Sequence, residues 1–376
     1  LASTDNWFRP VQLANGPDGC LYVLDMYREV IEHPWSLPSG IKRHVDLNSG
    51  NDRGRIWRIR PEKFVRPASS RLSKATSGEL VSILSAPNAW RRETAARLLF
   101  ERQDLQVVPA LSKLAAEGES HLGRLHALYV LAGLGKLEPS HLLRALGDEH
   151  PVLREHALKL VENFLVEDGM DKSRLAKTVL ALGSDESSRV RFQLALTLGE
   201  VELTGEVSVL LDVLSSGVNN SWIRAAVLNA LSTQVNELFS HYADSVPPTD
   251  KGEVVALANG LRKGGRALQG LEPETSKYLR NVAMVVVRGD DRSSALRLQA
   301  VGLLGELDKK AALPPLLDFL DAKEASLRGG AVEELIRLQP KGLSVYFFDR
   351  WKSLSVSSRD EVIGFLLGET ERTKAL

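Results

Sequence analysis

The chain has 376 residues, 43% of them hydrophobic and 26% charged, which is ordinary for globular proteins and long enough for two or more domains. Its 48 lysines and arginines balance 48 aspartates and glutamates, so it lacks the positive field of a general nucleic-acid binder and we expect no nucleic-acid partner. The single cysteine, Cys20, excludes an intrachain disulfide, a zinc site of paired cysteines and the C-x-x-C-H attachment of a c-type haem. The sequence has no run of about 18 apolar residues, so no transmembrane segment is predicted.

Residues 5–66 carry the signals of β-strands. Three short runs rich in aromatic and β-branched residues, WFRPVQL (7–13), CLYVLDMY (20–27) and RGRIWRI (53–59), predict a small antiparallel sheet. The NGPDG segment at 15–19 supplies a tight turn, because glycine and asparagine tolerate positive φ angles. So few strands with open edges make a poor independent fold, whereas in a β-propeller such a sheet is one blade covered on both faces. We therefore predict that residues 1–66 are the last blade of an incomplete propeller, with the other blades upstream of Leu1 in a larger protein.

After Pro61 and Pro67 the pattern becomes helical, with a linker predicted at 67–78 and repeats over 79–376. Each repeat is marked by an arginine followed by small or aliphatic residues three, four and seven positions later, which gives one apolar helix face. The marker arginines are Arg92, Arg124, Arg154, Arg191, Arg224, Arg297 and Arg328. They recur at intervals of 30 to 37 residues, apart from one interval of 73 that fits two repeats, one of them degenerate.

A second apolar helix precedes most of the markers, as in VVPALSKLA (107–115) and LPPLLDFL (313–320). Two helices in each unit of 30 to 40 residues are typical of a solenoid, in which every repeat buries its face on its neighbours. The sequence therefore predicts a mostly α fold, an α-solenoid with a small N-terminal antiparallel sheet.

The repeat resembles the HEAT family, whose second helix reads V-R-x-x-A-A-x-A-L-G, most clearly in RVRFQLALTLG (189–199) and RLQAVGLLG (297–305). The resemblance implies an ARM-type superhelix and a turn acid that pairs with the marker arginine along the stack. Acids that lie six residues before a marker are Asp148, Asp185 and Asp291. The recurrence of the arginines at one helical position favours a structural ladder over the alternative, a phosphate-binding ladder.

Four motifs in the first 66 residues occur together: D-x-W-F-R-P-V (5–11), G-P-D-G-x-L-Y-V-x-D-x-Y-R (16–28), I-x-H-P (31–34) and N-D-R-G-R-I-W-R-I (51–59). In this combination the segment resembles the end of the propeller in planctomycete-type membrane-bound dehydrogenases, which are distantly similar to glucose/sorbosone dehydrogenases. The resemblance implies an exported bacterial protein at the periplasm or cell surface, with a cytochrome c-like domain after the HEAT repeats. It also implies a quinone or haem c as cofactor of the full-length protein, and no cofactor in this fragment. One blade cannot close a propeller channel, so the fragment alone is predicted to be inactive.

The polar residues of the blade have two interpretations. Residues that leave an inner strand of a propeller could line a substrate or cofactor pocket. The candidates for this pocket are Arg9, Asp25, Tyr27, Arg28 and His33. In the alternative, Asp18 shapes the turn, Asp25 caps a strand end and Arg28 ties down the long loop. His33 could be a base, a haem or metal ligand or a loop histidine, but no second ligand stands at a suitable spacing, so a structural role is favoured and no metal site is predicted.

The helical region offers no catalytic motif. Five of its histidines are predicted to lie at the surface or in turns, because they sit in or beside amphipathic helices at unrelated phases; these are His121, His126, His141, His150 and His156.

Two functions follow as hypotheses. The full-length protein is a propeller-type, dehydrogenase-like oxidoreductase whose HEAT repeats act as a spacer or dock a protein partner, or it is a non-enzymatic binding protein for a glycan or protein partner.

Overall fold

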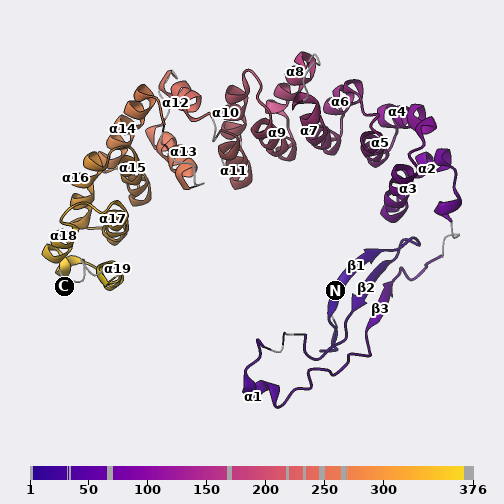
Figure 1. The fold of residues 1–376 in the computed structure, drawn as a ribbon, viewed down its shortest axis with the longest axis horizontal. Helices are drawn as coiled ribbons and strands as arrows, with labels where there is room; N and C mark the ends of the chain where they lie inside the picture. Colours follow the sequence, from indigo (N-terminus) through magenta and orange to yellow (C-terminus); the bar gives the residue numbers. More distant parts are fainter. Residues whose placement is uncertain are drawn as a thin grey trace. The chain divides into compact units, whose positions relative to one another are not determined.

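The computed structural model describes residues 3–31, 33, 35–65, 71–166, 172–216, 220–231, 234–244, 250–263, 268 and 270–367. These residues form 19 α-helices and one three-stranded sheet (Figure 1). The prediction of a mostly α, helical-repeat fold preceded by a small antiparallel sheet is confirmed. The chain divides into two compact units, Leu1–Phe164 and Leu165–Leu376.

The sheet of the first unit has the order β1 (Pro10–Asn15), β2 (Leu21–Asp25) and β3 (Arg55–Ile59), with both pairs antiparallel. The turn between β1 and β2 is held by Asp18, whose carboxylate accepts the Cys20 N–H at 3.0 Å and the Tyr22 hydroxyl at 2.9 Å. Gly19 has a φ of 82°, a conformation that favours glycine. The long connection from β2 to β3 contains one short helix, α1 (Ser39–Lys42).

The helices of the first unit form two layers. Their bounds, with the two 3₁₀ turns, are η1 (Leu72–Lys74), α2 (Ser77–Ile83), α3 (Ala89–Arg102), η2 (Leu105–Val107), α4 (Val108–Glu117), α5 (His121–Gly133), α6 (Pro139–Leu146) and α7 (Pro151–Val166). Figure 1 shows α2, α4 and α6 in one layer and α3, α5 and α7 in the other. The core between the layers contains Leu80, Leu99, Leu111 and Leu131, each at most 1% exposed. Each repeat therefore contributes one helix to each layer, as the apolar stripes require.

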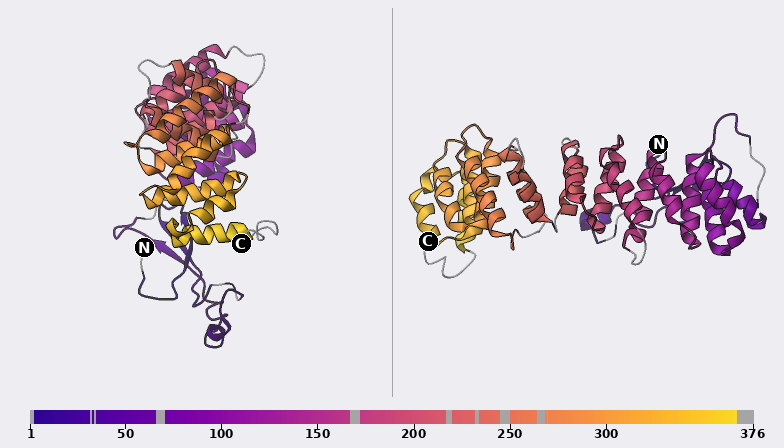
Figure 2. Two further views of the ribbon diagram at one scale, coloured as in Figure 1. Left: turned by 90° about the vertical axis from the view of Figure 1, so that its left-hand side faces the viewer. Right: turned by 90° about the horizontal axis from the view of Figure 1, so that it is seen from above.

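The second unit repeats this plan, and Figure 2 shows its helices stacked side by side. Its elements are α8 (Ser173–Ala181), η3 (Leu182–Ser184), α9 (Ser188–Glu200), α10 (Glu206–Ser216), α11 (Ser221–Ala230), α12 (Val235–Asp244), α13 (Lys251–Lys263), α14 (Pro273–Arg288), α15 (Ser294–Leu307), α16 (Lys309–Leu320), α17 (Ala325–Leu338), α18 (Leu343–Asp349), η5 (Trp351–Ser353) and α19 (Val356–Leu367). The odd-numbered helices from α9 to α19 contact one another in sequence. Glycines allow close approach in this layer: a Cβ at Gly199 would lie 3.2 Å from the Cα of Ala230.

Candidate functional site

Asp25 is the centre of the polar residues in the sheet. It ends β2, is 3% exposed, and its Oδ1 accepts the backbone N–H groups of Arg9 at 2.8 Å and Tyr27 at 2.9 Å. Its Oδ2 accepts the indole N–H of Trp57 at 2.9 Å. Burial alone would raise the pKa of Asp25, but these three hydrogen bonds and the charge of Arg55 hold it below the ordinary value. Asp25 is therefore a charged strand-end cap whose oxygens are occupied, which makes it a poor proton acceptor.

The other candidate pocket residues contact the loops around β2. Arg28 donates to the carbonyl of Leu47 at 2.6 Å and so fastens the long loop. Tyr27 has a φ of 48°, and the guanidinium carbon of Arg55 lies 3.4 Å from the centre of its ring. The Arg9 side chain donates to the carbonyls of Asn6, Phe8 and Glu29.

His33 takes part in a local turn: its Nδ1 accepts the Trp35 N–H at 3.2 Å, and its carbonyl accepts the Ser36 hydroxyl at 2.6 Å. The structure thus brings Arg9, Asp25 and Tyr27 together, and among the hydrogen bonds of the described residues none joins His33 to them.

The segment before residue 66 exposes many large apolar side chains, half of them in its strands and half outside the strands. Ten of the 21 large apolar side chains that are exposed among the described residues lie before residue 66, but only Cys20 and Val23 are buried apolar residues there. The register places Leu13, Val23 and Trp57 on one face, and Leu13 and Trp57 are 56% and 46% exposed. On the opposite face Ile56 is 67% exposed. This segment has apolar surface on both faces and little core of its own.

The marker arginines share one place in the helical repeats: each is the fourth residue of its helix. Nη1 of Arg92 donates to the carbonyls of Ala86 at 2.7 Å and Pro87 at 2.9 Å, six and five residues earlier. The same pair of bonds recurs at Arg124, Arg154, Arg191 and Arg328. The acceptors belong to the turn after the preceding helix, where carbonyls lack partners and a cation is favoured. In these five repeats the guanidinium therefore ties the turn between the repeat's two helices.

One ladder arginine also forms a strong ion pair across repeats. Arg124 and Asp148 make two hydrogen bonds of 2.8 Å, and their side chains are 9% and 12% exposed. The carbonyl of the same aspartate accepts a bond from Arg154 at 2.8 Å. Asp148 thus links two adjacent repeats. Its carboxylate binds the marker arginine of one repeat, and its carbonyl accepts a hydrogen bond from the marker arginine of the next.

The remaining ladder residues are arranged differently. Asp185 accepts the Ser187 N–H at 2.8 Å, and Asp291 lies 3.6 Å from Arg292. Arg224 is half-buried at the fourth position of α11. Arg297 donates through Nε to the carbonyl of Val287 at 3.0 Å, ten residues earlier.

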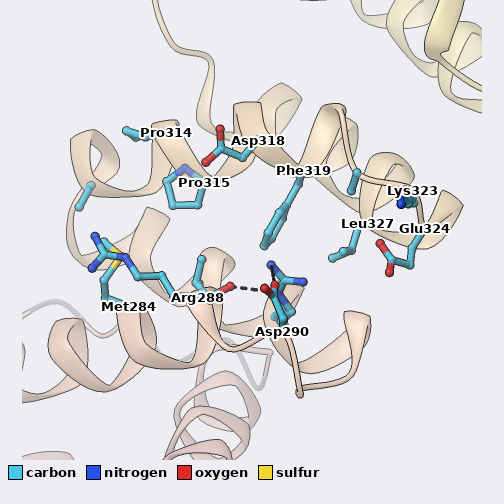
Figure 3. Close-up of a pocket in the computed structure, with 14 residues that line it drawn as sticks. Met284, Arg288, Asp290, Pro314, Pro315, Asp318, Phe319, Lys323, Glu324 and Leu327 are labelled. Atoms are coloured by element: carbon cyan, nitrogen blue, oxygen red, sulfur yellow. Dashed lines mark hydrogen bonds and ion pairs between the residues drawn. The ribbon is translucent and has the colours of Figure 1, made fainter.

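Arg297 lines a cavity of about 870 Å³ between α14, α16 and the start of α17 (Figure 3). Its guanidinium lies 4.9 Å from the centre of the Phe319 ring and 3.4 Å from Asp290. The charged side chains around the cavity are Arg288, Arg297, Lys323, Asp290, Asp318 and Glu324. Three positive and three negative groups give the cavity no preference for either sign of ligand charge.

The ladder has one more arginine, Arg359, that was not among the predicted markers. Arg359 is the fourth residue of α19 and donates to the carbonyls of Trp351 at 3.0 Å and Lys352 at 3.2 Å. The signal was present, because aliphatic residues Val362, Ile363 and Leu366 follow at the marker spacing. In the degenerate repeat the fourth residue of α13 is Val254, which explains the long interval between markers.

No three His, Cys, Asp or Glu side chains gather as a metal-binding cluster in the part of the chain that the structure describes. None of the described helices is long and apolar enough to cross a membrane.

A family model described as a domain of unknown function, DUF7133, matches residues 1–63, which end just after β3. No curated protein matches the chain. Among solved structures, the X-ray structure of YibA from Escherichia coli, a structural genomics target, has 16% identity and a TM-score of 0.39, covering 73% of this chain and 100% of that one.

Proposed function

We propose that the chain is the interaction scaffold of a larger protein, with residues 1–66 forming the last blade of a β-propeller and the helical repeats docking a protein partner. The claim that residues 1–66 are a propeller blade rests on one observation: the sheet has apolar side chains on both faces. A sheet that packs on helices needs only one apolar face, whereas a blade is covered by a neighbouring blade on each side. Two open edge strands, β1 and β3, also require cover in a stable protein.

The motifs of the blade support an exported, dehydrogenase-like oxidoreductase as the full-length protein, with a quinone or haem c bound outside this chain. In that arrangement the helical repeats separate the propeller from a downstream cytochrome c-like domain or dock a partner. The proposal of a location in the periplasm or at the cell surface rests on the same motifs.

A non-enzymatic binding protein for a glycan or protein is the second candidate, and one observation favours it. The buried carboxylate of Asp25 already accepts three hydrogen bonds, and Arg28 is engaged with the loop, so both side chains act in the architecture. Turnover would then require groups from outside the described residues.

The experiment compares the 376-residue chain with a version extended by its upstream coding sequence. If the blade proposal holds, amide hydrogen exchange in β1 and β3 is fast in the shorter chain and strongly protected in the longer one. Strong protection of both edge strands in the monomeric 376-residue chain would contradict it. The extended protein is then assayed with sugars and quinone acceptors: turnover favours the oxidoreductase, and glycan or protein binding without turnover favours the second candidate.

A further inference from the structure

Four of the eight histidines of the chain take part in three separate contacts along one boundary between repeats, that of α4 and α5 with α6 and α7. We call this set, His121, His141, His150 and His156, the histidine junction. His121 stacks on His150, the His141 ring contacts Ser112, and the His156 ring contacts Tyr129. The partners in these three contacts are 27 to 29 residues apart in the sequence, which is about one repeat.

The stacked pair is the part of the junction most sensitive to charge. The two rings are 3.9 Å apart and only 4° from parallel. Besides His150, the charged groups that act on His121 are Arg92 from α3, Arg124 from α5 and Asp148 before α7. Asp148 is bound to Arg124, and the Glu149 side chain is 88% exposed. Two imidazolium rings in this place would therefore repel each other with little compensation.

Two hydrogen bonds at the junction also require an unprotonated Nδ1. Nδ1 of His150 accepts the backbone N–H of Val152 at 3.3 Å, at the start of α7. Nδ1 of His141 accepts the N–H of Glu138 at 3.0 Å, so its proton is on Nε2, 3.0 Å from the Ser112 hydroxyl. A proton on either Nδ1 would remove an acceptor from the first turn of α6 or α7. The Tyr129–His156 bond of 2.7 Å tolerates protonation, because the phenol oxygen can accept as well as donate.

We propose that the histidine junction is an acid-sensitive contact between repeats, which loosens when protons bind to the stacked rings of His121 and His150. Burial, then the neighbouring His150 and Arg124, lower the pKa of His121. An unfolded histidine therefore binds its proton at a higher pH than the folded one does. The stability that the neutral pair contributes is present above pH 6.5, the ordinary value, and is lost as the pH falls towards the folded pKa.

Hydrogen exchange measured by mass spectrometry at pH 7.5 and pH 5.5 tests this in the intact chain. After correction for the intrinsic exchange rate, we expect protection of α6 and the first turn of α7 to fall at pH 5.5 by up to about tenfold, the limit for one histidine at one pH unit below its ordinary pKa. Helices α13 to α19 are the internal control, because the sequence has no histidine after His241. An equal change in both sets of helices would overturn the proposal.

A double variant assigns the effect to the stack. His121→Gln removes one titrating ring, and His150→Asn keeps an oxygen that can accept the N–H at the start of α7. In this variant the change in the logarithm of hydrogen-exchange protection between pH 7.5 and pH 5.5 is expected to fall to half or less of its wild-type size. The control His44→Gln, at an exposed loop position, should leave that change as it is in the wild type. A double variant with the full pH dependence of the wild type would refute the role of the stack.

Discussion

Replacing Asp148 by asparagine tests the ion pair between repeats. The change keeps the size of the side chain and an oxygen for the His150 N–H, but it removes the charge that faces Arg124. Removing one partner of a buried pair costs about 3–5 kcal/mol, because the other charge is left uncompensated. The Arg124 and Asp148 side chains are 9% and 12% exposed, and Arg124 keeps its bond to the Gly118 carbonyl. We therefore expect a loss of about 2–3 kcal/mol in the free energy of unfolding, just below that range, because Arg124 keeps a partner and the pair is not fully buried.

The assay is urea unfolding followed by circular dichroism, with hydrogen exchange of α5 to α7 to locate the loss. Asp291→Asn is the matched control, since both aspartates lie six residues before a marker arginine, but the Asp291 side chain is 79% exposed and 3.6 Å from its nearest cation. An exposed pair of this kind contributes at most about 1 kcal/mol, and we expect a change below about 0.5 kcal/mol. A loss below 1 kcal/mol for Asp148→Asn, or equal losses for both variants, would refute the reasoning.

Three further variants test the packing, the ladder and the sheet. Gly199→Val should destabilise the chain by about 2 kcal/mol, because the new side chain would overpack against the adjacent helix. Gly364→Ala should stabilise it by about 0.5–1 kcal/mol, because this helical position has open space around it. Both changes are measured in the same urea assay. Arg359→Met should cost about 1 kcal/mol and raise hydrogen exchange in α19 alone, and an unchanged α19 would contradict its place in the ladder. Because the pKa of Asp25 is lowered, its contribution is present above about pH 4 and lost as the pH falls through its folded pKa. The Trp57 indole N–H resonance should therefore shift below pH 4 in the wild type and not in Asp25→Asn, and an identical shift in both would exclude Asp25 as its cause.

The sequence was informative wherever a feature repeats. The predicted runs at 7–13, 20–27 and 53–59 correspond to the three strands, and the marker spacing located the fourth residue of seven helices. The same spacing rule, applied to the end of the chain, would have found Arg359. The reason is physical, since a turn with unpaired carbonyls recurs in every repeat and a long cationic side chain at the fourth position reaches it.

Spacing along the chain did not predict which partners meet across repeats. Asp148 lies six residues before Arg154, but its carboxylate binds Arg124, which is 24 residues earlier. The sequence distance to a partner in the adjacent repeat depends on how the helices stack, which no local pattern specifies. The histidines show the same limit, although the separation of 29 residues between His121 and His150, close to the repeat length, was a usable signal.

The sheet and the helices of the first unit are joined by one asparagine with two roles. Oδ1 of Asn88 accepts the N–H of Arg91 and caps α3, while its Nδ2 donates to the carbonyl of Gly16 in the turn between β1 and β2 at 3.1 Å. An amide side chain can do both, whereas an aspartate could only cap the helix. With two buried apolar residues of its own, the sheet depends on such contacts and on whatever covers its faces. We therefore expect the stability of the sheet to depend on groups outside residues 1–66.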